Sequence, residues 1–236
     1  VNAFADCEHL TSVTFSRNLI DIGEYAFSGC KSLSAINLPS GLLRIGKGAL
    51  GDCDSLVDVV IPRTVIHIGE KALSGNTTTL VVEEGNKRYD SRNNCNAIIE
   101  TATNTIIAVC KNTIFPNGVK FISQDVHSDL LENIVIPDGV QKIHRHTFYN
   151  CSNLKSIIIP DSVLLIEDEA FAYCGRLSSV TLGHNIAKIG KFVFYNLSYY
   201  NDYNKECLPT IKVPKGLKDK YLSMLHEDFA DRIIEL

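Results

Sequence analysis

The sequence predicts a solenoid in which short β-strands from successive coils stack into a parallel sheet, with little helix. Two observations predict it. Residues of one kind recur at a step of 23 positions, as Cys7, Cys30 and Cys53 do. Each repeated segment also contains a short stretch in which apolar and polar residues alternate, which is typical of a half-buried strand. One such unit cannot bury its own apolar edge, so stacked neighbours must supply the core.

Further columns keep this step and resume it after a break. They are Phe4, Phe27, Leu50 and Leu73; Leu10, Leu33 and Leu56; Ile22, Ile45 and Ile68; Phe148, Phe171 and Phe194; Cys151 and Cys174; and Ile143, Ile166 and Ile189. So many columns at one period indicate a true structural repeat. We therefore expect Phe27, Leu50, Phe148 and Phe171 to lie in one file inside the solenoid.

The clearest copy of the unit runs from residue 26 to residue 46. Within it, Ile36 and Leu38 are expected to face the core while Asn37 faces outward. Pro39 ends the strand because proline has no N–H to donate to the ladder. Gly46 suits a tight corner.

About eight coils are expected, with strands ~4.8 Å apart. Their inward strand residues are Val13/Phe15, Ile36/Leu38, Val59/Ile61, Leu80/Val82, Ile134/Ile136, Ile157/Ile159, Val180/Leu182 and Ile211/Val213.

This unit resembles the BspA-like class of leucine-rich repeats, found on many surface and secreted proteins of gut and oral anaerobic bacteria and of some protists. The resemblance covers nearly the whole chain. It implies an α/β leucine-rich-repeat solenoid, a right-handed superhelix with a parallel sheet on one face. It also implies a secreted or cell-surface location and adhesion to a host-matrix protein, another cell-surface protein or a glycan.

The register slips between Ile68 and Ile143. Within this stretch, residues 97–100 and 105–109 are predicted to form a β-hairpin joined by residues 101–104. The passage near residues 83–115 resembles the elongated repeat of the family, in which a hairpin projects from one coil. We favour an extension that covers the convex side over a recognition element, although loops on a rigid scaffold often carry function.

The domain boundary is placed at residue 214, with a solenoid over residues 1–214 and a cap over residues 215–236. Leu217, Tyr221 and Leu225 have helical spacing, and a solenoid needs an atypical terminal unit to cover its last coil. An amphipathic helix for a partner is the alternative. At the other end, the apolar edge near Phe4 and Phe15 would be left bare, which favours further repeats and an export signal upstream.

Charge and hydropathy exclude two classes of partner. The formal net charge is −4 and the isoelectric point is about 6.0, whereas nucleic acids and anionic membranes require dense basic patches. No apolar run approaches the ~20 residues that span a bilayer. We therefore expect neither nucleic-acid binding nor membrane insertion by this segment.

The cysteines indicate packing rather than chemistry. Those of the repeat column, Cys7, Cys30, Cys53, Cys151 and Cys174, are expected to be free thiols that pack as small apolar groups and bond to adjoining backbone. Cys95 and Cys110 flank the predicted hairpin strands, so a disulfide between them is possible. Zinc-ligand spacing is absent.

No motif predicts catalysis. His144 and His146 form the one close histidine pair, and we expect both on a solvated turn without a third metal ligand. No nucleophile, base and orienting group form a recognisable set. The sequence therefore predicts no catalytic residue, no metal ligand and no cofactor, and a protein that is not an enzyme.

The remaining candidate is the outward sheet face, whose side chains are small, mostly neutral and partly apolar. Such an array suits an extended partner, and an apolar stripe can mark an interaction site. An ordinary β-branched sheet surface explains the same residues, and both interpretations stay open. The candidate binding residues are Asn37, Asp58, Val60, Val81, Asn133, Val135, Ser156, Ile158 and Thr181. The predicted function is an interaction or adhesion scaffold. The alternative is a structural spacer with ligand recognition outside this segment.

Overall fold

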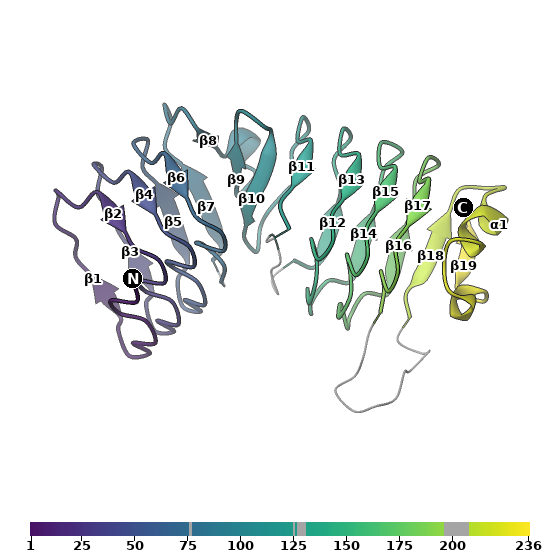
Figure 1. The fold of residues 1–236 in the computed structure, drawn as a ribbon, viewed down its shortest axis with the longest axis horizontal. Coiled ribbons are helices and arrows are strands. Elements are labelled where there is room, and N and C mark those ends of the chain that lie inside the picture. The colour runs from purple at the N-terminus through teal and green to yellow at the C-terminus, as the bar shows by residue number, and fades with distance from the viewer. Residues whose placement is uncertain (76, 125, 127–130, 196–207) are drawn as a thin grey trace. The chain divides into compact units, whose positions relative to one another are not determined.

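The computed structural model describes residues 1–75, 77–124, 126, 131–195 and 208–236. These residues form two compact units, Val1–Ile114 and Phe115–Leu236. In both units, short strands lie side by side in successive coils (Figure 1). The predicted solenoid with little helix is therefore confirmed.

The first unit carries two columns of parallel strands. The first strand column contains β1 (Ser12–Val13), β3 (Ala35–Ile36), β5 (Asp58–Ile61) and β7 (Thr79–Val82), paired as β1 with β3 and β5 with β7. The second strand column contains β2 (Asp21–Ile22), β4 (Arg44–Ile45) and β6 (His67–Ile68). Partners such as Ile22 and Ile45 lie 23 residues apart. Neighbouring strands are therefore paired in the register that the 23-residue sequence repeat predicts.

The second unit repeats this plan. Its first strand column contains β12 (Asn133–Val135), β14 (Ser156–Ile158), β16 (Ser179–Thr181), β18 (Thr210–Val213) and β19 (Ile233–Glu235), all parallel. Its second strand column contains β13 (Lys142–Ile143), β15 (Leu165–Ile166) and β17 (Lys188–Ile189), and β11 (Phe121–Ile122) lies beside β13. Considering both units, all eight predicted inward pairs fall in a first-column strand or within two residues of its end.

A third side of each coil is a turn rather than a strand, and we call these segments the turn column (residues 24–29, 47–52, 146–150, 169–173 and 191–195). Main-chain N–H groups of one turn donate to carbonyls of the next, as Phe27 does to Ala49 at 2.9 Å and Phe171 to Val193 at 3.0 Å. The turns require positive φ at repeated positions, including +57° at Gly48. A Cβ added at Gly48 would lie 2.5 Å from the Tyr25 ring, so a larger residue there would require this exposed side chain to shift.

The core is a file of side chains from the turn column between the two strand columns. The rings of Phe4 and Phe27 stack with centroids 5.2 Å apart in the first unit, where Leu50 is also buried. In the second unit, Phe148 and Phe171 stack at 5.2 Å. The predicted file is thus present within each unit.

The predicted hairpin is present in the first unit with the expected bounds, β9 (Ala97–Glu100) and β10 (Thr105–Val109), paired antiparallel. It does not project as expected. Ala97, Ile98 and Ile99 of β9 are fully buried, because β9 also pairs with β8 (Tyr89–Asp90) and Ile98 packs into the apolar core. Only the turn between the strands, with a 3-10 turn η1 (Arg92–Asn94) nearby, offers exposed residues.

The C-terminal segment covers the last coil with mixed structure. It contains helix α1 (Lys218–Leu222), a 3-10 turn η3 (Glu227–Phe229) and β19. The helical spacing expected over residues 215–226 yields only this short helix, because the chain turns back so that β19 can extend the sheet beside β18. Tyr221 is fully buried and its hydroxyl donates to the Gly183 carbonyl. The domain boundary at residue 214 stays a prediction.

Candidate interaction surface

The outward face of the first strand column holds the candidate binding residues because side chains alternate along a strand. In the first unit, β5 and β7 bury Val59 and Leu80. The intervening residues point outward in register, so that Val60 lies beside Val81 with 49% and 37% of their surface exposed. Two neighbouring coils thus place two valines together on this face.

The second unit carries a similar group. Val135 of β12 pairs in register with Ile158 of β14, with exposed fractions of 59% and 46%. Beside them, the Ser156 hydroxyl donates to the Asn133 side-chain oxygen at 2.6 Å. Thr181 of β16 continues the row beyond Ile158. An apolar pair with a polar border therefore spans three coils.

The structure places the nine candidates in two groups, one in each unit. The first-unit group is exposed and contains Asn37, Asp58, Val60 and Val81. In the second unit, Asn133, Val135 and Ile158 are exposed while Ser156 and Thr181 are half-buried. Their role in binding stays a prediction.

A second exposed apolar stripe was not predicted from the sequence. Ile20, Leu43 and Ile66 precede the second-column strands β2, β4 and β6, and they are 59%, 38% and 54% exposed. Main-chain bonds tie them together, since the N–H of Leu43 donates to Ile20 and that of Ile66 to Leu43, both at 2.9 Å. The 23-residue step between them was visible in the sequence. However, an apolar column in a repeat is normally expected to face the core, so the sequence did not indicate that these side chains point outward.

All five repeat cysteines are free thiols, as predicted. Four of them are buried, and the thiols of Cys30, Cys53 and Cys174 bond to backbone carbonyls, whereas Cys7 is exposed rather than packed, so the prediction is wrong at that position. The thiol of Cys53 donates to the carbonyl of Phe27 in the preceding coil at 3.2 Å, and Cys174 does the same to Phe148 at 3.1 Å. Burial raises the pKa of the Cys53 thiol to about 12. A thiol held this way is a poor nucleophile at neutral pH because the thiolate is scarce.

Cys95 and Cys110 are separate buried thiols rather than a disulfide. The Cys110 sulfur lies 3.1 Å from the carbonyl oxygens of Thr78 and Asn96, while the Cys95 sulfur lies 3.7 Å from that of Ala97. Burial raises the pKa of both thiols. They therefore pack the base of the hairpin in the same way as the repeat cysteines pack the coils.

His146 lies on the turn column and His144 directly follows β13, and each ring faces an acidic residue one coil on. His146 Nε2 lies 2.6 Å from Glu169, and His144 Nδ1 lies 3.5 Å from Glu167. The bond from His146, followed by that from Arg145, lowers the pKa of Glu169 below its ordinary value. Among the described residues, no group of three or more His, Cys, Asp or Glu is placed to hold a metal ion.

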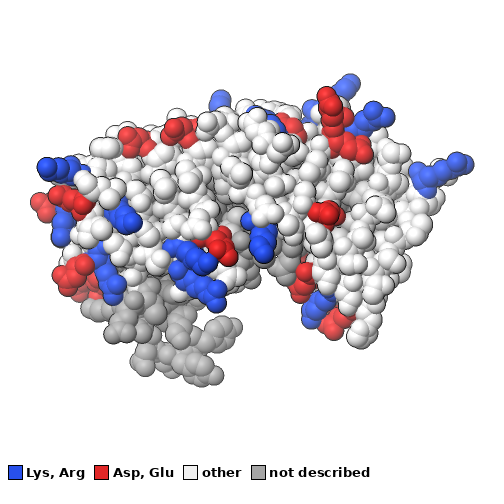
Figure 2. All heavy atoms as spheres, turned by 180° about the vertical axis from the view of Figure 1, so that it is seen from behind, with Lys and Arg blue, Asp and Glu red and all other residues white. Residues whose placement is uncertain are grey.

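Charge is scattered over the surface. On the face seen in Figure 2, uncharged residues cover most of the area, and acidic and basic groups occur near one another. Several are paired across coils, such as Lys31 with Glu8 at 2.8 Å and Lys155 with Glu132 at 2.8 Å. That face offers no broad single-sign field of the kind that attracts nucleic acid. Within the described segments, no helix has the length and apolar content needed to cross a bilayer.

Comparison with known proteins agrees with this architecture. A sequence model of the BspA type leucine rich repeat region matches six copies over residues 1–106 and 108–211. No curated protein matches the chain.

Solved structures with a similar fold include two bacterial proteins. A leucine rich cell surface protein from Faecalibacterium prausnitzii is 22% identical, with a TM-score of 0.59 over 99% of this chain and 61% of that chain. The pneumococcal vaccine antigen PcpA is 19% identical, with a TM-score of 0.58 over 96% of this chain and 68% of that chain. At these identities the likeness shows the fold.

Proposed function

Because this chain belongs to the BspA-type leucine-rich repeat family, we propose that it is a non-catalytic interaction scaffold of a bacterial surface or secreted protein. Its partner is a host-matrix protein or another cell-surface protein. The outward face of the first strand column is the contact surface.

One observation carries the proposal, namely the register of the exposed apolar side chains. Val135 and Ile158 lie on adjacent parallel strands as direct partners, and so do Val60 and Val81. All four keep between 37% and 59% of their surface exposed. Contiguous exposed apolar groups with polar neighbours are typical of protein interaction sites.

The main chain of the scaffold holds these small outward side chains in fixed positions. Backbone pairing between coils fixes the position of every outward residue, as the bonds from Lys155 and Ser156 to Glu132 at 2.7 and 3.2 Å illustrate. A preorganised surface loses little entropy on binding. A stable complex buries roughly 800 Å² on each partner, so contacts have to extend over several coils.

The test is a matched pair of variants in the second unit. The full chain is presented to an array of purified matrix proteins, with glycans as a second panel. In the sheet-face variant Val135→Lys is combined with Ile158→Lys. The control variant carries Leu164→Lys, since Leu164 is also 46% exposed but precedes the second-column strand β15.

We expect a saturable protein binder whose affinity falls at least about tenfold in the sheet-face variant, because two apolar contacts are replaced by solvated charges. The control should bind as the wild type does. Circular dichroism and the melting temperature confirm that each variant folds. Equal binding by the sheet-face variant contradicts the assigned surface. Absence of any saturable binder favours the spacer, and binding to the glycan panel alone changes the partner class.

A further inference from the structure

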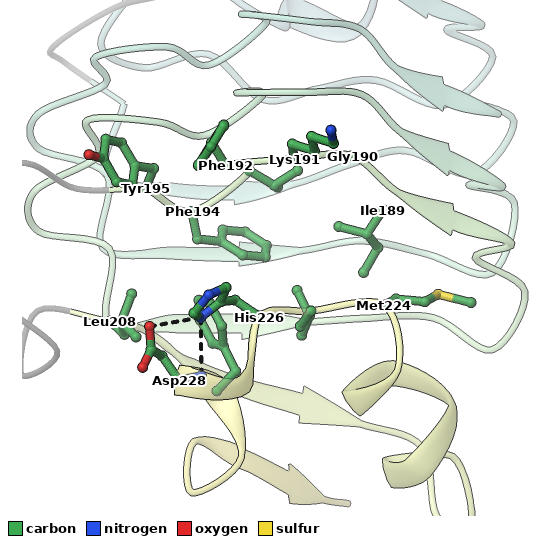
Figure 3. Close-up of a pocket in the computed structure, with 13 residues that line it drawn as sticks. Ile189, Gly190, Lys191, Phe192, Phe194, Tyr195, Leu208, Met224, His226 and Asp228 are labelled. Atoms are coloured by element: carbon green, nitrogen blue, oxygen red, sulfur yellow. Dashed lines mark hydrogen bonds and ion pairs between the residues drawn. The ribbon is translucent and has the colours of Figure 1, made fainter.

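A cavity of about 650 Å³ lies between the last full coil and the C-terminal segment of the second unit. Residues 189–195, which begin at the last residue of β17, form one wall, and residues 224–226, 228 and 229 form the other. Figure 3 shows the Phe194 ring and the Ile189 side chain between these walls, with Met224 and His226 opposite them. This volume falls within the range of small-molecule sites, ~300–1,000 Å³.

The lining is predominantly apolar. Ile189, Phe194, Leu208, Met224 and Phe229 all contribute to it. The Phe229 ring meets Phe194 edge to face at 6.0 Å, so it continues the aromatic file without filling the space around it. Met224 can adapt to an occupant because its side chain is unbranched and polarisable.

The cavity also lies where the hydrogen-bond ladder of the turn column ends. In the preceding coil, the N–H of Glu169 donates to Lys191 at 2.9 Å and that of Phe171 to Val193 at 3.0 Å. The corresponding groups of the next turn are the N–H groups of Phe192 and Phe194, and both residues line the cavity. Within the described residues, neither N–H has an acceptor.

The C-terminal segment replaces a further coil at other positions. Besides the β19 pairing and the Tyr221 bond, the Lys220 ammonium donates to the His184 carbonyl at 2.8 Å. These contacts cover the first strand column and one corner. The two main-chain donors of the turn column are left facing the cavity, since ladder donors point toward the next coil.

The charged groups of the lining disfavour an anion. The Asp228 carboxylate is only 5% exposed and lies 2.8 Å from His226 Nδ1. Figure 3 shows this pair at one side of the cavity, with the Lys191 side chain directed away from its interior. A second negative charge in a largely apolar space beside a carboxylate would be repelled.

We propose that this cavity binds a small, neutral, mostly apolar molecule whose carbonyl oxygen accepts from the N–H groups of Phe192 and Phe194. The apolar body occupies the space around Phe194, Ile189 and Met224. The carbonyl replaces the acceptor that a further coil would supply. This site is separate from the sheet face, so it stands or falls independently of the proposed function.

The probe is prodan, a neutral fluorescent naphthalene with a propionyl carbonyl, titrated into the full chain. Two related dyes test the chemistry. Phenylnaphthylamine has a similar apolar body without a carbonyl, and anilinonaphthalene sulfonate carries a negative charge. We expect one prodan per chain, and about tenfold weaker binding of each related dye, because the first leaves two donors unpaired and the second faces Asp228.

Nuclear magnetic resonance locates the site. Prodan should shift the amide signals of Phe192 and Phe194. The variant Met224→Trp should lose binding at least about tenfold because the larger ring fills the cavity, whereas Leu164→Trp, just before the second-column strand β15, should not. Met224→Phe provides a smaller obstruction should the tryptophan variant not fold. Unmoved amide signals, equal affinity for all three dyes, or unchanged binding by the filled variant would overturn the assignment.

Discussion

Replacing Phe171 with alanine tests the physical basis of the fold. This ring is 1% exposed and is stacked between two others, Phe148 at 5.2 Å and Phe194 at 5.6 Å. Its neighbours cannot close over the space. The bonds from Phe148 to Ala170 at 2.9 Å and from Phe171 to Val193 at 3.0 Å fix the separation of the coils.

The expected cost is about 4 kcal/mol. Phenylalanine-to-alanine changes in cores cost ~3–5 kcal/mol, and they cost more where the site cannot collapse. Each stacked pair contributes ~0.5–1.5 kcal/mol within such losses. Phe171→Leu should cost about 1.5 kcal/mol, because leucine already occupies the same column at Leu50 and Leu73 and the volume change is small.

The matched control is Phe4→Ala. Phe4 is 46% exposed and, among the described rings, stacks only on Phe27, so about 1.5 kcal/mol is expected. Urea unfolding followed by circular dichroism gives the free energy of unfolding. Native-state hydrogen exchange of amides in β14 and β16 reports the second unit separately, since repeat proteins can unfold in parts. A cost for Phe171→Ala below about 2 kcal/mol, or equal to that of Phe4→Ala, would refute the reasoning.

Three further outcomes follow from the same structure. Cys207 lies outside the described residues, so it is replaced by serine in the first test. In this Cys207→Ser variant, Cys7 should be the one thiol that reacts quickly with Ellman's reagent at about pH 8, because it is exposed whereas the other described thiols are buried. A second fast thiol would contradict this. The pKa of Glu169 is lowered in the folded state from the ordinary 4.5, so its contribution to stability is complete above that value and is lost as pH falls below it. Urea midpoints at about pH 7 and pH 3 should therefore differ less in Glu169→Gln than in the wild type, and an equal difference would argue against this carboxylate. Tyr221→Phe should lower the free energy of unfolding by ~1–3 kcal/mol, since it leaves the buried Gly183 carbonyl without its donor. An unchanged urea midpoint would show that this hydroxyl does not stabilise the fold.

Local pattern was sufficient for much of the fold. The alternation around Ile36 predicts which side chains face inward, and the 23-residue step predicts which strands are neighbours. Both follow from the chain itself, because each coil pairs with the next copy of the same sequence. The hairpin bounds at residues 97–100 and 105–109 were equally evident, since two β-branched runs flank a short polar turn.

What the sequence could not predict depends on contacts between segments without a common register. The burial of Ile98 comes from the pairing of β9 with β8 and from packing against the coils. The strand β19 forms because β18 presents an open edge, and a short run at Ile233 carries little pattern of its own. Likewise the cavity beside Phe194 results from the way in which a non-repeating segment meets a repeating one.

The two proposed sites differ in the part of the repeat from which they arise. Along the coils, main-chain pairing satisfies the backbone, so replacing an outward side chain such as Ile158 should cost the fold little. A partner can therefore be recognised on the sheet face without loss of the fold. At the end of the turn column the opposite holds. The Phe194 side chain belongs to the regular file, whereas that of Phe192 is exposed. Within the described residues, the N–H groups of both lack the partner that the repeat provides. In the earlier coils of the second unit, the following coil supplies a carbonyl at this position, as Ala170 does for Phe148 and Val193 for Phe171. The geometry of the repeat itself thus specifies the chemistry of the ligand, whereas on the sheet face it specifies only where a partner can bind.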